Sequence, residues 1–152
     1  MTGMPRRRLP LPRRAALGLL ASTALLVGCG GVTAPDLFIV QRSGSGPGAK
    51  LTLLINEEGG VSCNGVASAS GRKLKLSDSQ LVEARAIQED LREPAAKHTS
   101  LAPAAKSVLR YHVRDEHGSV SFSDNSAGQP QVFRRLALLV LRTAQRVCHL
   151  PE

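Results

Sequence analysis

The alternation of apolar and polar residues along the chain predicts four main β-strands, arranged as two antiparallel pairs. In the first pair, Leu51, Leu53 and Ile55 fall on one face of a strand that follows a glycine-rich stretch, residues 43–48. In the second pair, a turn at residues 116–118 joins two alternating runs, which is a hairpin signal. The strands are expected over residues 37–42, 51–55, 108–114 and 120–122, with briefer ones at 61–64 and 73–76.

A different spacing, with apolar residues three or four positions apart, predicts two helices. The first follows Ser77, which together with Gln80 matches a capping box, and Asp78 places a negative charge in its first turn. Its apolar spacing continues to Leu91. Pro94 is expected to end this helix, because proline lacks the backbone N–H that a helix interior needs.

The second helix is expected to start at Pro130, since proline suits the first helical turn. Its apolar face is broad, because Leu138 and Leu141 widen the inward-facing stripe. Such a face indicates deep packing or contact with a partner, and the helix is too short and too charged to span a membrane. The expected core stripe is Val132 or Phe133, Leu136, Leu139 or Val140, Thr143 and Val147.

Together these elements predict an α+β fold with the order β-β-α-β-β-α. The simplest arrangement is an antiparallel sheet of about four strands with two helices packed on one face. A chain of 152 residues is long enough for one such domain, which we place at residues 37–152.

The net charge of +8 is concentrated near the N-terminus rather than spread over this domain. Five of the twenty basic residues are arginines within positions 6–14, and all twelve acidic residues come after position 28. Without residues 1–28 the chain holds fifteen basic and twelve acidic residues, a net charge of +3. The sequence contains no basic stripe with interleaved aromatic residues, so nucleic-acid binding is not expected.

The N-terminal segment has the layout of a bacterial export signal. A basic stretch precedes an uncharged, mostly apolar run of 14 residues, Ala15 to Gly28. That length fits a signal core of about 7–15 residues better than a spanning helix of about 20. The residues Leu26-Val27-Gly28-Cys29 then resemble the lipobox of bacterial lipoproteins. The resemblance implies that residues 1–28 are removed and that Cys29 receives a diacylglyceryl group.

Lipidation of Cys29 implies a protein held on the extracytoplasmic side of the cell membrane, because more than one acyl chain gives stable attachment to membrane lipid. Residues 29–36 are then the tether, whose six residues 30–35 reach at most about 20 Å. The alternative is an ordinary signal peptide that leaves Cys29 as a free thiol, which is unusual in an exported protein. Arg13-Arg14 also permits export by a twin-arginine route.

Lipidation of the first cysteine leaves an even pair, Cys63 and Cys148. An oxidising compartment favours a disulfide between them. Closing so long a loop stabilises a domain by about 4–5 kcal/mol according to the chain-entropy argument. Two buried thiols are the alternative, and the spacing of these cysteines does not suit a metal site.

The titratable residues show no pattern of a catalytic or metal site. The four histidines lack the spacing of metal ligands, and the carboxylate pairs at residues 57–58 and 115–116 sit beside predicted turns. No serine lies in a G-x-S-x-G elbow, and the stretch at 43–48 lacks the lysine-serine ending of a phosphate-binding loop. The sequence therefore predicts no enzyme, no metal and no cofactor.

Two family resemblances extend over the chain. The order of its motifs, including DLFIVQRSGSGPGAKLTLL and LSDSQLVEARAIQEDL, is similar to that of small lipoproteins of high-GC actinobacteria. The mature domain, over residues 37–147, resembles the emfourin-like inhibitors of thermolysin-type metalloproteases. That resemblance is carried by Arg42-Ser43-Gly44 after the first strand, by Tyr111, Val113, Glu116, Gly118, Phe122 and Asp124 in the hairpin, and by Pro130.

From these observations we expect a lipid-anchored binding module, and the second resemblance suggests a protease as its partner. Its expected binding loop would enter a protease cleft as a strand-like mimic of a substrate, although the same loop is also compatible with a plain hairpin connection. An alternative function is a structural or assembly lipoprotein of the cell envelope, whose last helix docks a membrane partner. The candidate loop residues are Arg42, Ser43, Gly44, Ser45, Gly46, Pro47 and Gly48.

Overall fold

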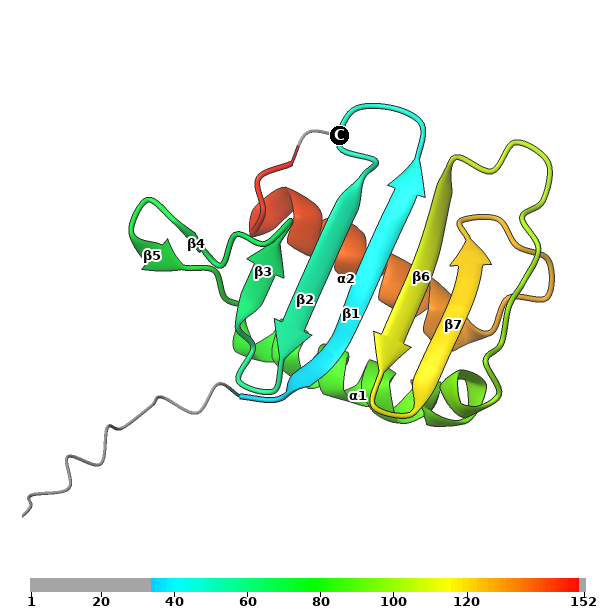
Figure 1. The fold of residues 1–152 in the computed structure, drawn as a ribbon, viewed down its shortest axis with the longest axis horizontal. Coiled ribbons are helices and arrows are strands. Elements are labelled where there is room, and N and C mark those ends of the chain that lie inside the picture. The colour runs from blue at the N-terminus through cyan, green and yellow to red at the C-terminus, as the bar shows by residue number, and fades with distance from the viewer. Residues whose placement is uncertain (1–33, 151–152) are drawn as a thin grey trace, which may run out of the picture. The chain divides into compact units, whose positions relative to one another are not determined.

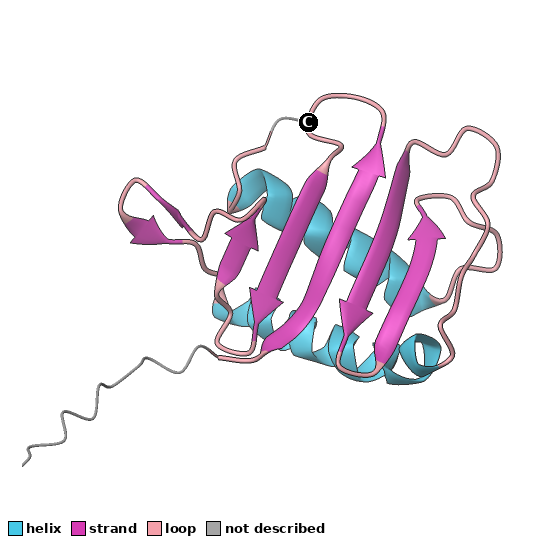
Figure 2. Ribbon diagram, viewed as in Figure 1, coloured by secondary structure: helices cyan, strands magenta, loops and turns pink. Residues whose placement is uncertain are grey.

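A computed structural model, which describes residues 34–150, has the predicted α+β fold. Five strands form one antiparallel sheet in the order β3-β2-β1-β6-β7, and two helices cover one of its faces (Figure 1). Within residues 34–150 the other face carries no helix (Figure 2). The elements are β1 (Asp36–Gly44), β2 (Leu51–Asn56), β3 (Val61–Cys63), β4 (Ser68–Ala69), β5 (Arg72–Lys73), α1 (Asp78–Ala96), β6 (Leu109–Asp115), β7 (Gly118–Ser123) and α2 (Gln131–Arg146).

Strand β1 is central to the sheet, because it pairs with β2 on one side and with β6 on the other. Val40 lies opposite both Leu53 and Val113, and all three side chains are buried. A bulge at the start of β1 shifts its register, so the adjacent side chains of Leu37 and Phe38 are both buried. The centre of the core is therefore built from the alternating positions that the sequence marked as strands.

The brief strand expected at residues 61–64 is present as β3, which makes the main sheet five-stranded. The brief strand expected at residues 73–76 is displaced, because Arg72–Lys73 pair with β4 in a separate exposed hairpin. Ser70 and Gly71, which join these two strands, both have positive φ angles, +51° and +74°. Positive φ at both turn residues is the geometry of a two-residue hairpin, so this local turn determines the pairing.

Helix α1 begins at the predicted capping box. The Ser77 hydroxyl accepts a hydrogen bond from the backbone N–H of Gln80, and the Gln80 side chain accepts one from the backbone N–H of Ser77. The prediction that Pro94 ends the helix is wrong, because α1 continues past it. A proline in the last turn removes a single backbone bond, and the Lys97 N–H still donates to the Glu93 carbonyl across it.

Helix α2 packs its predicted apolar stripe against the sheet. The ring of Phe133 stacks on Phe122 of β7 with centroids 4.7 Å apart, and Phe122 stacks on Tyr111 of β6 at 5.0 Å. Leu138 and Leu141 do not belong to this buried face, since they are 49% and 39% exposed. They lie on the outer side of α2, away from the core that the chain itself provides.

The two helices run in opposite directions and are joined by ion pairs. Arg135 of α2 lies 2.6 Å from Asp90 of α1, and Arg142 of α2 lies 3.6 Å from Glu83 of α1. Over the described range 34–150, no helix has the length and apolar character needed to cross a bilayer.

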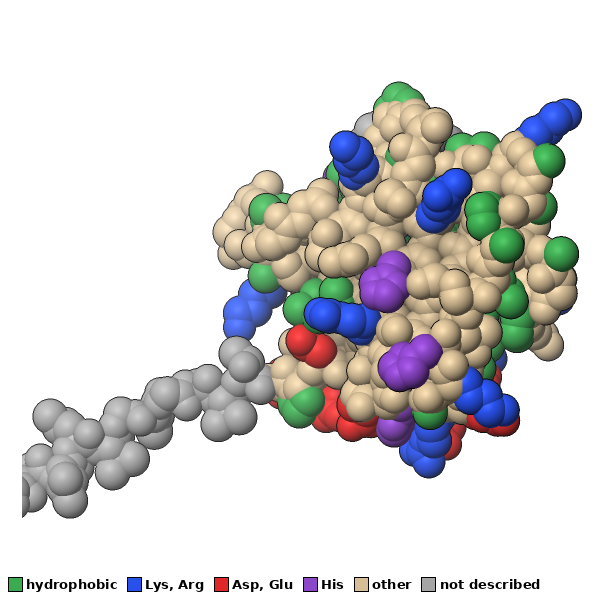
Figure 3. Space-filling view, turned by 45° about the vertical axis from the view of Figure 1, so that its right-hand side comes forward, with side chains coloured by type: hydrophobic (Ala, Val, Ile, Leu, Met, Phe, Trp, Pro, Cys, Tyr) green, Lys and Arg blue, Asp and Glu red, His purple; other side chains and the backbone are tan. Residues whose placement is uncertain are grey.

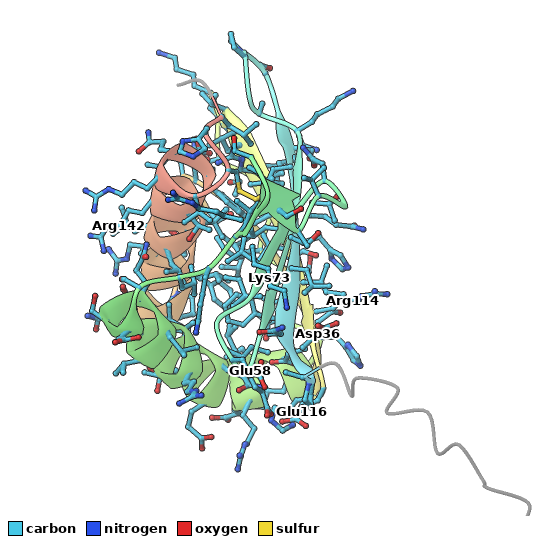
Figure 4. All side chains as sticks on the ribbon, turned by 90° about the vertical axis from the view of Figure 1, so that its left-hand side faces the viewer. Asp36, Glu58, Lys73, Arg114, Glu116 and Arg142 are labelled. Atoms are coloured by element: carbon cyan, nitrogen blue, oxygen red, sulfur yellow. A yellow bond between two sulfur atoms is a disulfide. The ribbon has the colours of Figure 1, made fainter. Side chains whose placement is uncertain are left out.

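The expected disulfide is formed between Cys63 of β3 and Cys148, just after α2 (Figure 4). The two cysteines are 85 residues apart in the sequence. The bond therefore ties the edge of the sheet to the end of the last helix. The predicted signal peptide, the predicted lipidation site Cys29 and most of the predicted tether fall within residues 1–33, which lie outside the described residues.

Candidate functional site

The predicted binding loop connects β1 to β2 at one end of the sheet (Figure 1). Residues 43–47 are exposed, and Gly48 is partly buried. The loop closes in a turn in which the Ala49 N–H donates to the Gly46 carbonyl at 3.3 Å. Pro47 and Gly48 occupy the centre of this turn, and the φ of +68° at Gly48 suits a type II turn. The exposed loop therefore has a defined backbone shape.

Arg42 does not belong to the exposed part of this loop, contrary to the sequence-based expectation. Its side chain is only 6% exposed, because it lies on the inward face of β1 with Val40. Its Nε donates to the carbonyl oxygen of Ala49 at 3.2 Å, and its Nη2 donates to that of Gly48 at 2.6 Å. Arg42 thus holds the returning end of the loop from inside the domain.

The outgoing end of the loop is held by the segment that precedes β6. The Ser45 N–H donates to the Val108 carbonyl oxygen at 3.2 Å. A Cβ atom added at Gly44 would lie 2.1 Å from the same oxygen, so only glycine allows this approach. Both ends of the exposed loop are therefore fixed to the body of the domain.

The buried cation of Arg42 lies close to the single tyrosine of the chain. Removal of the Tyr111 hydroxyl from water raises its pKa above the ordinary value. The positive charge of Arg42 acts in the opposite direction, while the negative charge of Asp124 adds to the increase. The pKa of Tyr111 therefore depends on how well the interior beneath the loop is shielded from water.

The face of the sheet that carries no helix continues from this loop and is polar. Arg110, His112 and Arg114 alternate along β6 with the buried residues Tyr111 and Val113, so their side chains share the open face. Figure 3 shows basic and histidine side chains spread over this side of the molecule and most of the acidic ones near its lower edge. Residues of the neighbouring strands on this face include Gln41, Ser43, Ser119 and Ser121.

Histidines on this side of the domain pair with serine hydroxyls rather than with metal-ligating neighbours. His112 Nδ1 lies 2.9 Å from the Ser121 hydroxyl oxygen, across the β6–β7 pair, and His98 Nδ1 lies 3.3 Å from that of Ser119. No described carboxylate bonds to either ring nitrogen of His112. Among residues 34–150, no group of three or more His, Cys, Asp or Glu side chains is placed to hold a metal ion.

The carboxylates predicted to lie beside turns are found there. Asp115 Oδ1 accepts hydrogen bonds from the backbone N–H groups of His117 and Gly118, at 2.8 and 3.0 Å, and so shapes the β6–β7 turn. His117 itself lies in this turn, 3.5 Å from a carboxylate oxygen of Glu116. Asp115, Glu116 and His117 thus shape or flank the β6–β7 turn, and they do not share a cleft with the β1–β2 loop.

No protein-family model, curated protein or solved structure matches the chain. The resemblances to actinobacterial lipoproteins and to emfourin-like inhibitors therefore stay predictions.

Two features of this region were missed from the sequence. The first is the inward position of Arg42. The sequence did contain a signal for it, because Arg42 continues the alternation of the buried residues Phe38 and Val40. The second feature is a segment before β6, where Ser100 forms a parallel bridge to Ser121 and so adds to the edge of the sheet at β7. No local pattern predicts that bridge, since it depends on how the long connection folds back.

Proposed function

We propose that the protein is a lipid-anchored, extracytoplasmic binding module whose β1–β2 loop inserts into the cleft of a partner protein. The observation that carries the proposal is the exposed loop at residues 43–47, held at one end by Arg42 and at the other by Val108. A loop already fixed in one shape loses less conformational entropy on binding, which favours affinity.

A protease is the partner class that we test first. The resemblance to emfourin-like inhibitors suggests it, and the loop leaves strand β1 in an extended conformation before it turns at residues 46–49. One edge of residues 43–45 is already paired with β6 and Val108, so the segment would present the backbone groups of its other edge to a substrate cleft, as a substrate strand does. The side chains at the tip are small, so the backbone can approach closely.

The membrane anchor is supported by the lipobox Leu26-Val27-Gly28-Cys29. Acylation at Cys29 would place the start of β1 only a few residues from the bilayer. The partner would then be an exported or membrane-bound protein at the same surface.

The test is inhibition of a thermolysin-type metalloprotease by the purified protein. We expect wild type to inhibit at micromolar concentration or below. Ser45→Arg, in the loop, should weaken inhibition at least tenfold, because a long charged side chain alters the inserted tip. Ser68→Arg is the matched control, since it makes the same exchange at an exposed residue of β4. An absence of inhibition by wild type would refute the protease proposal.

A second function is favoured by the outer side of α2. Leu138 and Leu141 are exposed beside Arg134, and α2 contains no acidic residue. Under the structural or assembly alternative, this surface docks a membrane protein of the cell envelope. Replacing both leucines by serine should then shift the detergent-extracted protein from a larger complex to the single chain on a native gel. Val66→Ser, which replaces an exposed apolar residue outside α2, should leave the complex intact.

A further inference from the structure

The open face of the sheet is hollowed above β1, β6 and β7, beside the loop just described. The hollow has a volume of about 390 Å³, within the roughly 300–1,000 Å³ common for small-molecule sites. Its floor carries Gln41, Ser43, Arg110, His112 and Ser121, all on strands of the sheet. These side chains are donors or mixed donor–acceptors in hydrogen bonding, and one is a permanent cation.

The charge in this hollow is unbalanced. Arg110 is exposed, and its side chain forms no hydrogen bond or ion pair with any residue in 34–150. No aspartate or glutamate lines the hollow. The carboxylate of Asp124, which follows Ser123 at the edge of the hollow, already accepts hydrogen bonds from the Ser107 hydroxyl and the Val108 N–H. The Arg110 guanidinium has no ion-pair partner within residues 34–150, so it is positioned to bind an external anion.

A second hollow, at the other end of the same face, provides an internal comparison. It is lined by Arg114 together with Asp36, Asp115 and Glu116, so carboxylates share this hollow with its arginine. Figure 4 shows Arg114, Asp36 and Glu116 at this end of the sheet. Both hollows contain an arginine of β6, yet only the one around Arg110 lacks carboxylates. The two hollows differ in charge because Arg110 lies near the start of β6, whereas Asp115 and Glu116 lie at its other end, beside the turn to β7.

The polar groups around Arg110 are held in place by the strand register. Ser43 lies opposite Arg110, and Gln41 lies opposite His112 on the neighbouring strand β1. On the other side, His112 Nδ1 lies 2.9 Å from the Ser121 hydroxyl oxygen. Side chains on paired strands share one rigid surface, so the donors around the hollow need little reorganisation to bind.

The rim of the hollow is fixed as well. Ser100, Leu101 and Pro103 form one wall. The Leu101 N–H donates to the Ser121 carbonyl at 2.8 Å, and the Ser121 N–H donates to the Thr99 carbonyl at 2.9 Å. This wall is therefore bonded to β7 by backbone hydrogen bonds, and it gives the polar floor a concave shape.

We propose that this hollow binds a small organic phosphate, with Arg110 as the charge partner and with His112, Gln41 and the serine hydroxyls as hydrogen-bond donors. A phosphate group offers several strong acceptor oxygens, which matches the number of donors converging there better than a carboxylate does. The phosphate belongs either to a soluble phosphate ester or to a phospholipid headgroup. This site is separate from the tip of the β1–β2 loop, and its existence does not depend on protease binding.

The test is isothermal titration of the full-length protein, purified in detergent, with three soluble probes. Glycerol 3-phosphate represents a free phosphate monoester, glycerophosphoglycerol represents the diester headgroup of a phospholipid, and glycerol is the uncharged control. We expect one saturable site for at least one phosphate probe and none for glycerol. Arg110→Gln should weaken binding about tenfold or more, as loss of a charged hydrogen bond predicts.

Arg72→Gln is the matched control, because it removes the same charge from an exposed position on β5, outside every proposed binding surface. It should bind as wild type does. Arg110→Gln should keep the unfolding temperature of wild type, since Arg110 has no partner to lose in the described structure. Preference for the monoester would identify a soluble ester, and preference for the diester a headgroup. Failure of both phosphates to bind, or equal affinity in wild type and Arg110→Gln, would overturn the proposal.

Discussion

The Nη2 atom of Arg42 lies 2.6 Å from the carbonyl oxygen of Gly48, so a strand residue binds the far end of the loop that starts beside it. The Nε atom of the same side chain binds the next carbonyl, that of Ala49. A buried charge of this kind needs hydrogen-bond partners, and the loop backbone supplies them. The shape of the loop and the stability of the domain are therefore linked through one residue.

Replacing Arg42 by glutamine should destabilise the domain by about 2 kcal/mol, because hydrogen bonds to a charged group are lost inside the protein. Arg42→Lys should cost less, since an ammonium group keeps the charge and can still bind one carbonyl. Urea unfolding of the three proteins measures the differences. An Arg42→Gln protein as stable as wild type would show that the two carbonyls do not depend on this side chain.

The pKa of Tyr111 should lie above that of an exposed tyrosine, because burial disfavours the phenolate. The protonated form is favoured in the folded state, so its contribution to stability is complete below the unfolded pKa of about 10. That contribution is lost as the pH rises through the higher folded pKa. Tyr111 is the only tyrosine and the chain has no tryptophan, so absorbance at 295 nm follows it directly. A midpoint equal to that of the urea-unfolded chain would contradict the buried position.

Replacing Cys63 and Cys148 together by serine should lower the free energy of unfolding by about 4 kcal/mol, the value expected for constraining a long loop. The folded sheet should persist, because both residues lie at its periphery near the end of α2. Chemical unfolding with circular dichroism measures both effects. Equal stability of the variant and of the oxidised wild type would show that the bond does not constrain the unfolded chain.

The sequence predicted the parts of the fold that depend on local rules. The capping box at Ser77 and Gln80 and the alternation around Val40 identified a helix start and the central strand, because each is set by neighbouring residues. The end of α1 was misplaced at Pro94, since one missing backbone bond is tolerated in a last turn.

The candidate site was predicted less completely than the fold. The position of the loop at residues 43–48 followed from its glycines, whereas the wall at Ser100 depends on a long connection that folds back onto β7. Arg42 was included in the binding loop because it begins the Arg42-Ser43-Gly44 motif, although its place in the strand alternation pointed inward. Contacts that join distant segments could not be predicted from spacing alone.

Replacing Cys29 by alanine should release the protein from the membrane fraction, because the site of acylation is lost. Ultracentrifugation of lysed cells, followed by immunoblotting, measures the partition. Ser62→Ala, which leaves the lipobox intact, serves as the control and should remain with the membranes. Membrane retention of the Cys29→Ala protein after a high-salt wash would contradict lipid anchoring.

The proposed binding function requires that Arg42 holds the β1–β2 loop in one shape. The most direct measurement is the inhibition constant for a thermolysin-type protease, compared between wild type and Arg42→Gln under conditions in which both are folded. Arg42 is buried and does not reach a partner in the present conformation, so its effect must pass through the loop. We predict inhibition by wild type and about three- to tenfold weaker inhibition by Arg42→Gln, as expected for a looser loop. Equal inhibition by the two proteins, or none by wild type, would contradict the claim.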